Sequence, residues 1–268
     1  MKKQNNGDPG ETAWKALLDV LRKRNAISSA VLAQLVKEHT NVAADYALRH
    51  LQRKGVLQRP ETGPRGVYVV AHGKGGVHVT DPIGIVQVVY GENVLFGYGT
   101  ALFLHGLSRY ARLSEYYVVS SAKRKRRSMG NFAIRFVKTP LSEQIGISII
   151  RHGRRSVRVT DLERTVIDCI HRPKYAQGWE NVVHALSRVE RANGMRLIEY
   201  AKQYRTPSLV AKIGLILEHF GDRWKISGAT LDSLRPYLPR TPVKFSRGSG
   251  GLLNRDWNIF VPEGVFRE

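Results

Sequence analysis

The sequence predicts an α+β protein of mixed α/β type built from two domains. Its 268 residues, of which 42% are hydrophobic, are enough for two cores of ordinary globular composition. Apolar residues recur at helical spacing from Trp14 to Leu51, and strand-like and helical segments follow after Thr80. The glycine-rich stretch His72–Gly76 separates the two patterns. We therefore expect one domain over residues 1–75 and a larger α/β domain over residues 76–268.

Three short helices are predicted in the first domain. Thr12 can cap the first helix, Ser28 or Ser29 the second and Asn41 the third, because short polar side chains accept hydrogen bonds from free backbone N–H groups. Gly55 supplies the permissive position after the third helix. In that third helix the residues expected to face the core share helical spacing: Ala44, Ala47, Leu48 and Leu51.

A β-hairpin is predicted directly after the third helix. Two short strands, Val56–Arg59 and Val67–Val70, flank a segment rich in Gly and Pro at residues 60–66. Three short helices followed by a hairpin are the layout of a winged helix-turn-helix. In that motif the recognition helix reads the major groove of DNA, and the hairpin is the wing.

The second domain is predicted to contain strands followed by helices. The strand-like segments are Tyr116–Ser120, Ile134–Lys138, Ile147–Ile150, Ser156–Val159, Val243–Phe245 and Trp257–Val261. Thr160 and Glu163 have the T-x-x-E spacing of a capping box, which predicts that a helix begins there. Three further helices are predicted at Trp179–Arg191, Met195–Tyr204 and Pro207–Phe220.

The charge of the chain is the most unusual property of its composition. Lys and Arg number 43 against 22 Asp and Glu, which gives a net charge of +21. Between Arg109 and Lys174 the chain has 16 basic and 5 acidic residues, including the runs Lys123–Arg127 and Arg151–Arg155. A surplus of this size repels itself unless a polyanion supplies the opposite charge. We expect double-stranded DNA as the partner, and charge alone fits RNA equally well.

The predicted DNA-contacting residues fall into two groups. The first belongs to the winged helix-turn-helix, where the third helix faces the bases and the wing approaches the backbone: Asn41, Asp45, Tyr46, Arg49, Arg53, Lys54, Arg59 and Arg65. The second comprises the basic runs, which we expect at hairpin tips in contact with phosphates: Lys123, Arg124, Lys125, Arg126, Arg127, Arg151, Arg154 and Arg155. Arg49 is the residue that we expect to discriminate most strongly between bases.

No catalytic residue, metal site or cofactor is predicted. The segment Leu95–Leu102 resembles the Gly-rich turn of nucleotidyltransferases, but residues 104–113 contain no carboxylate that could hold metal ions. The later strands lack the acidic and E-x-K-like spacing of a restriction-type nuclease, and the nine histidines lack the spacing of zinc ligands. We therefore expect a binding protein rather than an enzyme.

A cluster of charged residues in the helix after Thr160 has a structural interpretation. Asp161, Glu163, Arg164 and Asp168 lie within about two helical turns, and residues one turn apart share a face. A catalytic carboxylate cluster is one reading of this spacing. We interpret it instead as a helix start followed by an internal ion pair.

A cytoplasmic location is expected from the absence of targeting signals. The start of the chain has two lysines but no apolar run behind them, and no segment reaches the roughly 18 apolar residues of a membrane span. The single cysteine, Cys169, cannot close a disulfide within the chain, so nothing indicates an oxidising compartment. No membrane partner is expected.

Two further segments indicate a family. The predicted winged helix together with the segments Gly99–Leu107 and Arg158–Asp168 resembles the AbiEi antitoxins of type IV toxin–antitoxin systems, which act in abortive infection. The resemblance spans nearly the whole chain. It implies a repressor that binds inverted repeats in the promoter of its own operon. It also implies that the second domain counteracts a nucleotidyltransferase toxin without forming a stable complex, and that no catalytic residue is present.

Two other classes of protein remain compatible with the sequence. One is an ordinary winged-helix regulator with a ligand-sensing second domain, and a toxin gene directly downstream would argue against it. The other is a nuclease fused to a winged helix, which metal-dependent cleavage of DNA would support.

Overall fold

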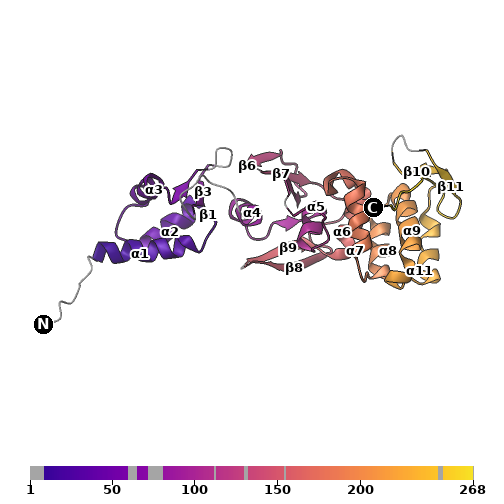
Figure 1. Cartoon of the computed structure of the whole chain (residues 1–268), viewed down its shortest axis with the longest axis horizontal. Helices are drawn as coiled ribbons and strands as arrows, with labels where there is room; N and C mark the ends of the chain where they lie inside the picture. The colour runs from indigo at the N-terminus through magenta and orange to yellow at the C-terminus, as the bar shows by residue number, and fades with distance from the viewer. Residues whose placement is uncertain are drawn as a thin grey trace. The chain divides into compact units, whose positions relative to one another are not determined.

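The computed structural model describes residues 9–59, 65–71, 81–111, 113–129, 132–153, 155–246 and 250–267 (Figure 1). The chain folds into two compact units, one made of Met1–Val94 with Arg126–Ile134 and the other of Leu95–Lys125 with Arg135–Glu268. Both units contain helices and strands, which confirms the predicted mixed fold class. Within the described ranges no helix is long and apolar enough to cross a membrane.

The first unit contains the three helices and the two strands predicted before residue 71, together with a short strand before the second helix, a fourth helix and strand residues from later in the chain. Its elements are α1 (Pro9–Arg22), β1 (Ala26–Ser28), α2 (Ser29–His39), α3 (Ala44–Arg53), β2 (Leu57–Gln58), β3 (Val67–Val70), α4 (Pro82–Tyr90), β6 (Arg127–Met129) and the start of β7 (Phe132–Val137). The strand β3 lies between β1 and β2 in an antiparallel sheet. The sequence does not predict β1, because three residues are too few to show alternation and only pairing with β3 defines the strand.

Of the helix caps predicted in this unit, only one is found in the structure as predicted. Ser28 caps α2 as predicted, since its Oγ accepts a hydrogen bond of 3.2 Å from the backbone N–H of Val31. The predicted cap of α3 is wrong. That helix begins at Ala44 with no side-chain cap, and Asn41 lies in the turn before it. The first helix begins at Pro9, ahead of the predicted start.

The first unit extends beyond residue 75, where the sequence places the domain boundary. The helix α4 packs against β1 and β3. Asp81 caps α4 by accepting a 2.8 Å hydrogen bond from the backbone N–H of Gly84, and its other oxygen accepts a 3.0 Å hydrogen bond from the Asn25 side chain. These contacts fasten α4 to the preceding helices and sheet, so this part of the unit ends at Val94.

The second unit combines a mixed sheet with a group of helices. Its strands are β4 (Leu95–Phe96), β5 (Glu115–Val119), the end of β7, β8 (Ile147–His152), β9 (Arg155–Thr160), β10 (Val243–Lys244), β11 (Leu252–Asn254) and β12 (Ile259–Val261). The larger sheet has the order β6-β7-β5-β4-β9-β8, and β10, β12 and β11 form a small separate sheet. Only the pair of β4 and β9 is parallel among the pairings described in the larger sheet.

The helices of the second unit surround its core. They are α5 (Tyr98–Leu104), α6 (Leu162–His171), α7 (Trp179–Arg188), α8 (Gly194–Gln203), α9 (Pro207–His219), α10 (Gly221–Trp224) and α11 (Gly228–Asp232). The helix α5 contacts both β5 and α6, so it joins the sheet to the helical layer. In Figure 1 the helices α6 to α9 stand together beside that sheet, and α6 contacts α7, α8 and α9.

The predicted capping box at the start of α6 is wrong. Asp161 is the cap, because its Oδ1 accepts a 2.8 Å hydrogen bond from the backbone N–H of Arg164, whereas Thr160 is the last residue of β9. Glu163 does not reach back to the cap. Its Oε1 accepts a 2.9 Å hydrogen bond from the backbone N–H of Asn193, so it ties the start of α6 to the segment before α8.

Trp257 fills a space that only a glycine leaves open. Its side chain is fully buried, and its Nε1 donates a 2.9 Å hydrogen bond to Glu218. The ring lies directly against Gly214 in α9, where an added Cβ would come within 2.0 Å of a ring carbon. Because the ring is rigid and enclosed, it cannot move aside for a larger side chain.

We predict that Gly214→Ala lowers the free energy of unfolding of the second unit by about 1–3 kcal/mol, the usual cost of overpacking a core. Urea unfolding followed by tryptophan fluorescence measures this change. Gly228→Ala is the matched control, since Gly228 has open space around its Cβ position. If both variants unfold at the same urea concentration, the close packing of Trp257 on α9 is contradicted.

Candidate nucleic-acid interface

The helix α3 has one buried and one exposed face, as its spacing predicts. Ala47 and Leu51 are buried in the core of the first unit, and Ala44 and Leu48 are half-buried. The predicted DNA-contacting residues of this region all lie exposed: Asn41, Asp45, Tyr46, Arg49, Arg53 and Lys54. Arg49 donates from Nε to the carbonyl oxygen of Asp45 at 3.2 Å, so its side chain lies along its own helix.

A row of aromatic rings supports Tyr46 on α3. The rings of Tyr46 and His50 stack with centroids 6.1 Å apart, and the ring of His50 lies 4.8 Å from that of Trp14 on α1. The Tyr46 side chain is nevertheless 48% exposed. A ring held in this way loses little conformational freedom when it contacts a partner. His50 is not among the predicted contact residues, although its spacing of one helical turn from Tyr46 indicates that the two rings can touch.

The wing residues lie at the ends of the paired strands β2 and β3. Arg59 follows β2 and Arg65 precedes β3, and both side chains are exposed. The predicted Gly/Pro tip between them falls outside the described residues. Gly66, next to Arg65, has a φ of +77°, and its carbonyl oxygen accepts a 2.7 Å hydrogen bond from the backbone N–H of Ser29. The start of β3 is thereby fixed to the start of α2.

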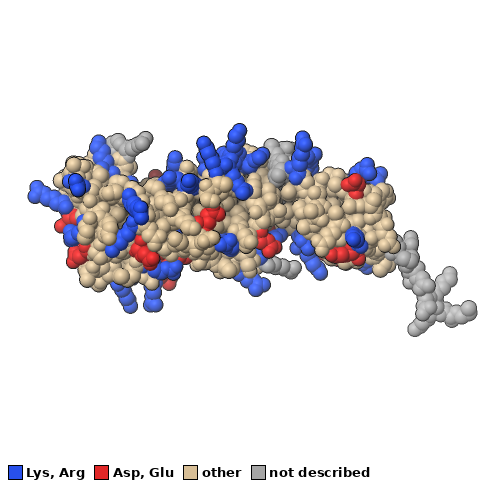
Figure 2. Space-filling view, turned by 180° about the vertical axis from the view of Figure 1, so that it is seen from behind, with Lys and Arg blue, Asp and Glu red and all other residues tan. Residues whose placement is uncertain are grey.

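The first basic run, Lys123–Arg127, lies in the connection from β5 to β6, and its last residue begins β6. It does not form the predicted hairpin tip. All of its side chains are exposed, and Figure 2 shows Lys and Arg side chains gathered over β6 and β7. Arg124 lies over the ring of Phe136 at 5.3 Å, and Arg126 donates a 3.2 Å hydrogen bond to the hydroxyl of Ser128.

The second basic run occupies the turn between β8 and β9, as expected for a hairpin tip. Arg151 lies in β8 and is exposed, and its Nε lies 3.4 Å from the carbonyl oxygen of Gly153. Arg155 begins β9 and is half-buried. Arg154, between them, lies outside the described residues.

Other basic residues of the central segment form hydrogen bonds and ion pairs within the protein. Arg135 donates two hydrogen bonds of 3.0 and 3.1 Å to Glu115, and this contact raises the pKa of Arg135. The hydroxyl of Tyr117 donates to the same carboxylate at 3.0 Å. Arg172 donates a 3.1 Å hydrogen bond to the carbonyl oxygen of Lys138. The basic residues of this segment are therefore divided between internal contacts and exposed positions such as Lys123–Arg127 and Arg151.

The charged cluster at the start of α6 has the predicted internal ion pair. The Nε of Arg164 lies 3.6 Å from Asp168, and both side chains are fully buried. The same guanidinium donates to the carbonyl oxygens of Ser142 (2.8 Å) and Ile145, and to the hydroxyl of Thr139 (3.1 Å). Arg164 thus holds the whole connection between β7 and β8 against α6.

The perturbed acidity of Asp168 has a structural cause. Burial raises the pKa of this carboxyl to about 6, although Arg164 and the donated hydrogen bond from the Tyr204 hydroxyl act to lower it. The pockets described in the second unit are lined by other residues. Strongly shifted pKa values occur both in catalytic sites and in buried ion-pair networks. Because this one lies between packed helices, we interpret the cluster as part of the core.

The glycines of the predicted Gly-rich turn are explained by packing. An added Cβ on Gly97 would lie 2.6 Å from the Val119 side chain, and one on Gly99 would lie 2.9 Å from the carbonyl oxygen of Tyr175. Both residues stand at the start of the buried helix α5. Over the part of the chain that the structure describes, no group of three or more His, Cys, Asp or Glu could hold a metal ion.

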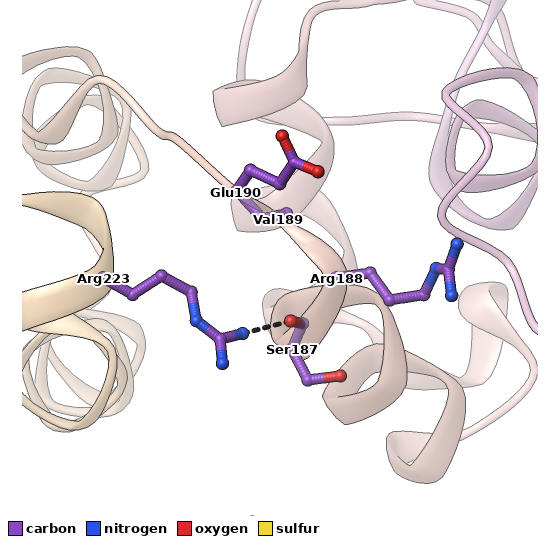
Figure 3. A pocket seen from close by; sticks show the side chains of 5 residues that line it. All are labelled: Ser187, Arg188, Val189, Glu190 and Arg223. Atoms are coloured by element: carbon purple, nitrogen blue, oxygen red, sulfur yellow. Dashed lines mark hydrogen bonds between the residues drawn. The ribbon is translucent and has the colours of Figure 1, made fainter.

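A pocket of about 480 Å³ lies where the end of α7 meets α10 (Figure 3). It is lined by Ser187, Arg188, Val189, Glu190 and Arg223. Arg223 reaches across the space and donates a hydrogen bond to the carbonyl oxygen of Ser187, whereas the Arg188 side chain points away from it. Four of the five lining residues are polar or charged, whereas small-molecule sites are usually lined mainly by apolar side chains.

Comparison with known proteins shows the fold. No family model matches the chain, and no curated protein sequence matches it. Among solved structures, the chain is similar to the crystal structure of the RV2827C protein from Mycobacterium tuberculosis, with a TM-score of 0.67 and 14% sequence identity. The similarity covers 93% of this chain and 90% of that one. The two proteins therefore share a fold over nearly their whole length.

Proposed function

We propose that the chain is a transcriptional repressor that binds double-stranded DNA through α3 and the wing, and that it is not an enzyme. The observation that carries this proposal is the exposed polar face of α3, which lies opposite the buried residues Ala47 and Leu51. A helix with such a face fits the major groove, where side chains can reach the edges of the bases. The net charge of +21 supports a polyanionic partner.

We extend the proposal to the antitoxin of a type IV toxin–antitoxin system. The protein would repress its own operon through inverted repeats in the promoter and counteract a nucleotidyltransferase toxin in the cytoplasm, without a stable complex. This part rests on the resemblance of the segments Gly99–Leu107 and Arg158–Asp168 to AbiEi antitoxins. Many residues of these segments are buried, including Arg164 and Asp168, so the resemblance supports a shared fold more directly than shared contact residues.

The alternative of a ligand-sensing regulator has less support. The pocket at Arg188 and Arg223 is crossed by the hydrogen bond that Arg223 donates, and four of its five lining residues are polar or charged. Small-molecule sites are usually lined mainly by hydrophobic and aromatic side chains.

Our first functional prediction concerns base recognition. We expect Arg49→Ala to weaken binding to the promoter repeat by about 1–3 kcal/mol and to relax the preference at one base pair, while binding to random DNA changes little. Competition gel shifts with single-base variants of the repeat measure both effects. Arg22→Ala removes the same charge from α1 and is the matched control. Equal losses on the repeat and on random DNA would show that Arg49 contacts only phosphate.

The second prediction concerns the exposed run Lys123–Arg127. Replacing these residues with Ser should weaken binding equally on all sequences and reduce the slope of log K against log salt by about one unit for each phosphate that the chain no longer neutralises. Fluorescence anisotropy at several salt concentrations measures the slope. The exposed residues Lys225 and Arg240, changed to Ser, serve as controls. An unchanged slope in the run variant would exclude the run from the DNA interface.

The third prediction separates repression from toxin neutralisation. With the toxin expressed from an unrelated promoter, the full-length Arg49→Ala chain should lose repression of its own promoter and still restore growth. The reason is that α3 belongs to the first unit, whereas the antitoxin activity is assigned to the second. Colony counts and a promoter reporter, measured in the same cells, check this. If the variant neither represses nor restores growth, the assignment of the two roles to separate units is wrong.

A further inference from the structure

Two serines of the chain directly follow a pair of arginines. Ser128 follows the run Lys123–Arg127, and Ser156 follows Arg154 and Arg155. No other serine or threonine of the sequence has arginine at both preceding positions. Protein kinases select substrates partly by charge, and basic residues ahead of a serine complement a kinase whose substrate groove is acidic. The sequence therefore indicates two candidate phosphorylation sites and does not distinguish between them.

The structure presents Ser128 in a form that such a kinase can bind. Ser128 lies in β6, an edge strand of the larger sheet that pairs, among the described strands, only with β7. Its side chain and those of the five preceding residues are all exposed, and residues 123–126 belong to no helix, strand or turn. An edge strand offers one row of backbone groups to a partner that binds it in extended form. Both the serine and the basic residues before it are therefore accessible.

Ser156 is presented differently, although its side chain is also exposed. It lies in β9 directly opposite Arg151 of β8, and His152 is paired with Arg155. The chain therefore reverses its direction just before the serine, and Gly153 in this turn has a φ of +60°. Arg155 is half-buried. A kinase that reads an extended basic segment would have to unpair the two strands to bind here.

The hydroxyl of Ser128 has a cationic partner. Arg126 donates a 3.2 Å hydrogen bond to its Oγ. Residues 116–142 contain seven Lys and Arg and no Asp or Glu, so no carboxylate of this segment competes for these cations. A phosphate on Ser128 would carry about −1.5 to −2 charges near pH 7 and accept charge-assisted hydrogen bonds from the Arg126 guanidinium. Because Ser128 is exposed, the phosphate needs no space in the core.

We propose that Ser128 is a phosphorylation site for a kinase that prefers basic residues ahead of its serine, and that its phosphate weakens the binding of the run Lys123–Arg127 to DNA. The Ser128 Oγ attacks the γ-phosphorus of ATP, the bond from that phosphorus to the bridging oxygen breaks, ADP leaves, and the hydroxyl proton passes to a carboxylate of the kinase. The phosphate offsets about two of the five positive charges of the run. The second part of this inference rests on the proposed DNA binding, and the first part does not.

The test incubates the folded full-length chain with ATP and the catalytic subunit of cyclic-AMP-dependent protein kinase, and peptide mass spectrometry locates the phosphate. We expect one phosphate per chain, on Ser128. Ser128→Ala should abolish this incorporation, and Ser156→Ala is the matched control that should incorporate phosphate like the wild type. Arg126→Ala keeps the serine and should slow incorporation about tenfold, because it removes one charge that the kinase reads.

A second measurement gives the effect of the phosphate. The phosphorylated chain should bind a random-sequence DNA duplex more weakly, with a slope of log K against log salt that is lower by about one to two units. Fluorescence anisotropy at several salt concentrations measures this slope. The Ser128→Ala chain, treated with the same kinase and ATP, should bind as it did before the treatment.

The outcomes separate this inference from the proposed function. A chain without phosphate on Ser128, or with equal or faster incorporation at Ser156, overturns the assignment of the site. Phosphate on Ser128 with an unchanged salt slope overturns the effect assigned to it. A wild-type chain that binds no duplex overturns the proposed function together with that effect, whereas phosphate located on Ser128 in the same sample supports the site by itself.

Discussion

The buried guanidinium of Arg164 is the contact on which the second unit depends. It pairs with Asp168 one helical turn away and donates to the connection between β7 and β8, so one side chain joins α6 to the sheet. A charge removed from water is costly unless its partners are complete. The carbonyl oxygens of Ser142 and Ile145 and the hydroxyl of Thr139 supply partners for the two terminal nitrogens, whereas Nε has no hydrogen-bond partner and faces Asp168 at 3.6 Å. Removing one member of such a buried pair typically costs about 3–5 kcal/mol.

The same helix start explains why a cluster of carboxylates and arginines need not be a catalytic site. Asp161 caps α6 and accepts a hydrogen bond of 2.7 Å from Tyr200 and one of 2.5 Å from Arg196. Glu163 accepts from the backbone before α8. Both acidic groups therefore have partners from α8 or from the residue before it. The cluster positions these helices.

The exposed surfaces differ in the kind of contact that they can make. The exposed face of α3 combines charged and aromatic side chains on a regular helix. Tyr46 is restricted by stacking on His50, whose ring in turn lies against Trp14. Such a surface suits recognition of base edges. The side chains of the run Lys123–Arg127 are all exposed and all basic. A run of this kind suits phosphates, which are recognised mainly through their charge.

The sequence by itself determined the elements with strong periodicity. The helices α7, α8 and α9 lie close to their predicted positions, and α3 has the predicted inward and outward faces. Helical spacing is a pattern of residues close together in the sequence, so it can be recognised without the tertiary structure. The strands β8 and β9 were predictable because the apolar character of a strand is also a pattern of neighbouring residues. Their exposed Ile149 was not, since a β-branched residue in an alternating strand reads as core.

Only the tertiary structure decided which polar residues belong to the fold and which remain at the surface. Asp81 is joined to Asn25, Glu163 to the backbone of Asn193, and Arg135 to Glu115. The partners in each pair are far apart in the sequence, so no local pattern identifies them. The contact of Asp81 holds α4 in the first unit. The contact of Glu163 takes the place of the predicted capping box of α6, and the contact of Arg135 uses its charge within the fold. A basic run and a buried arginine look alike in sequence because desolvation and hydrogen bonding depend on distant neighbours.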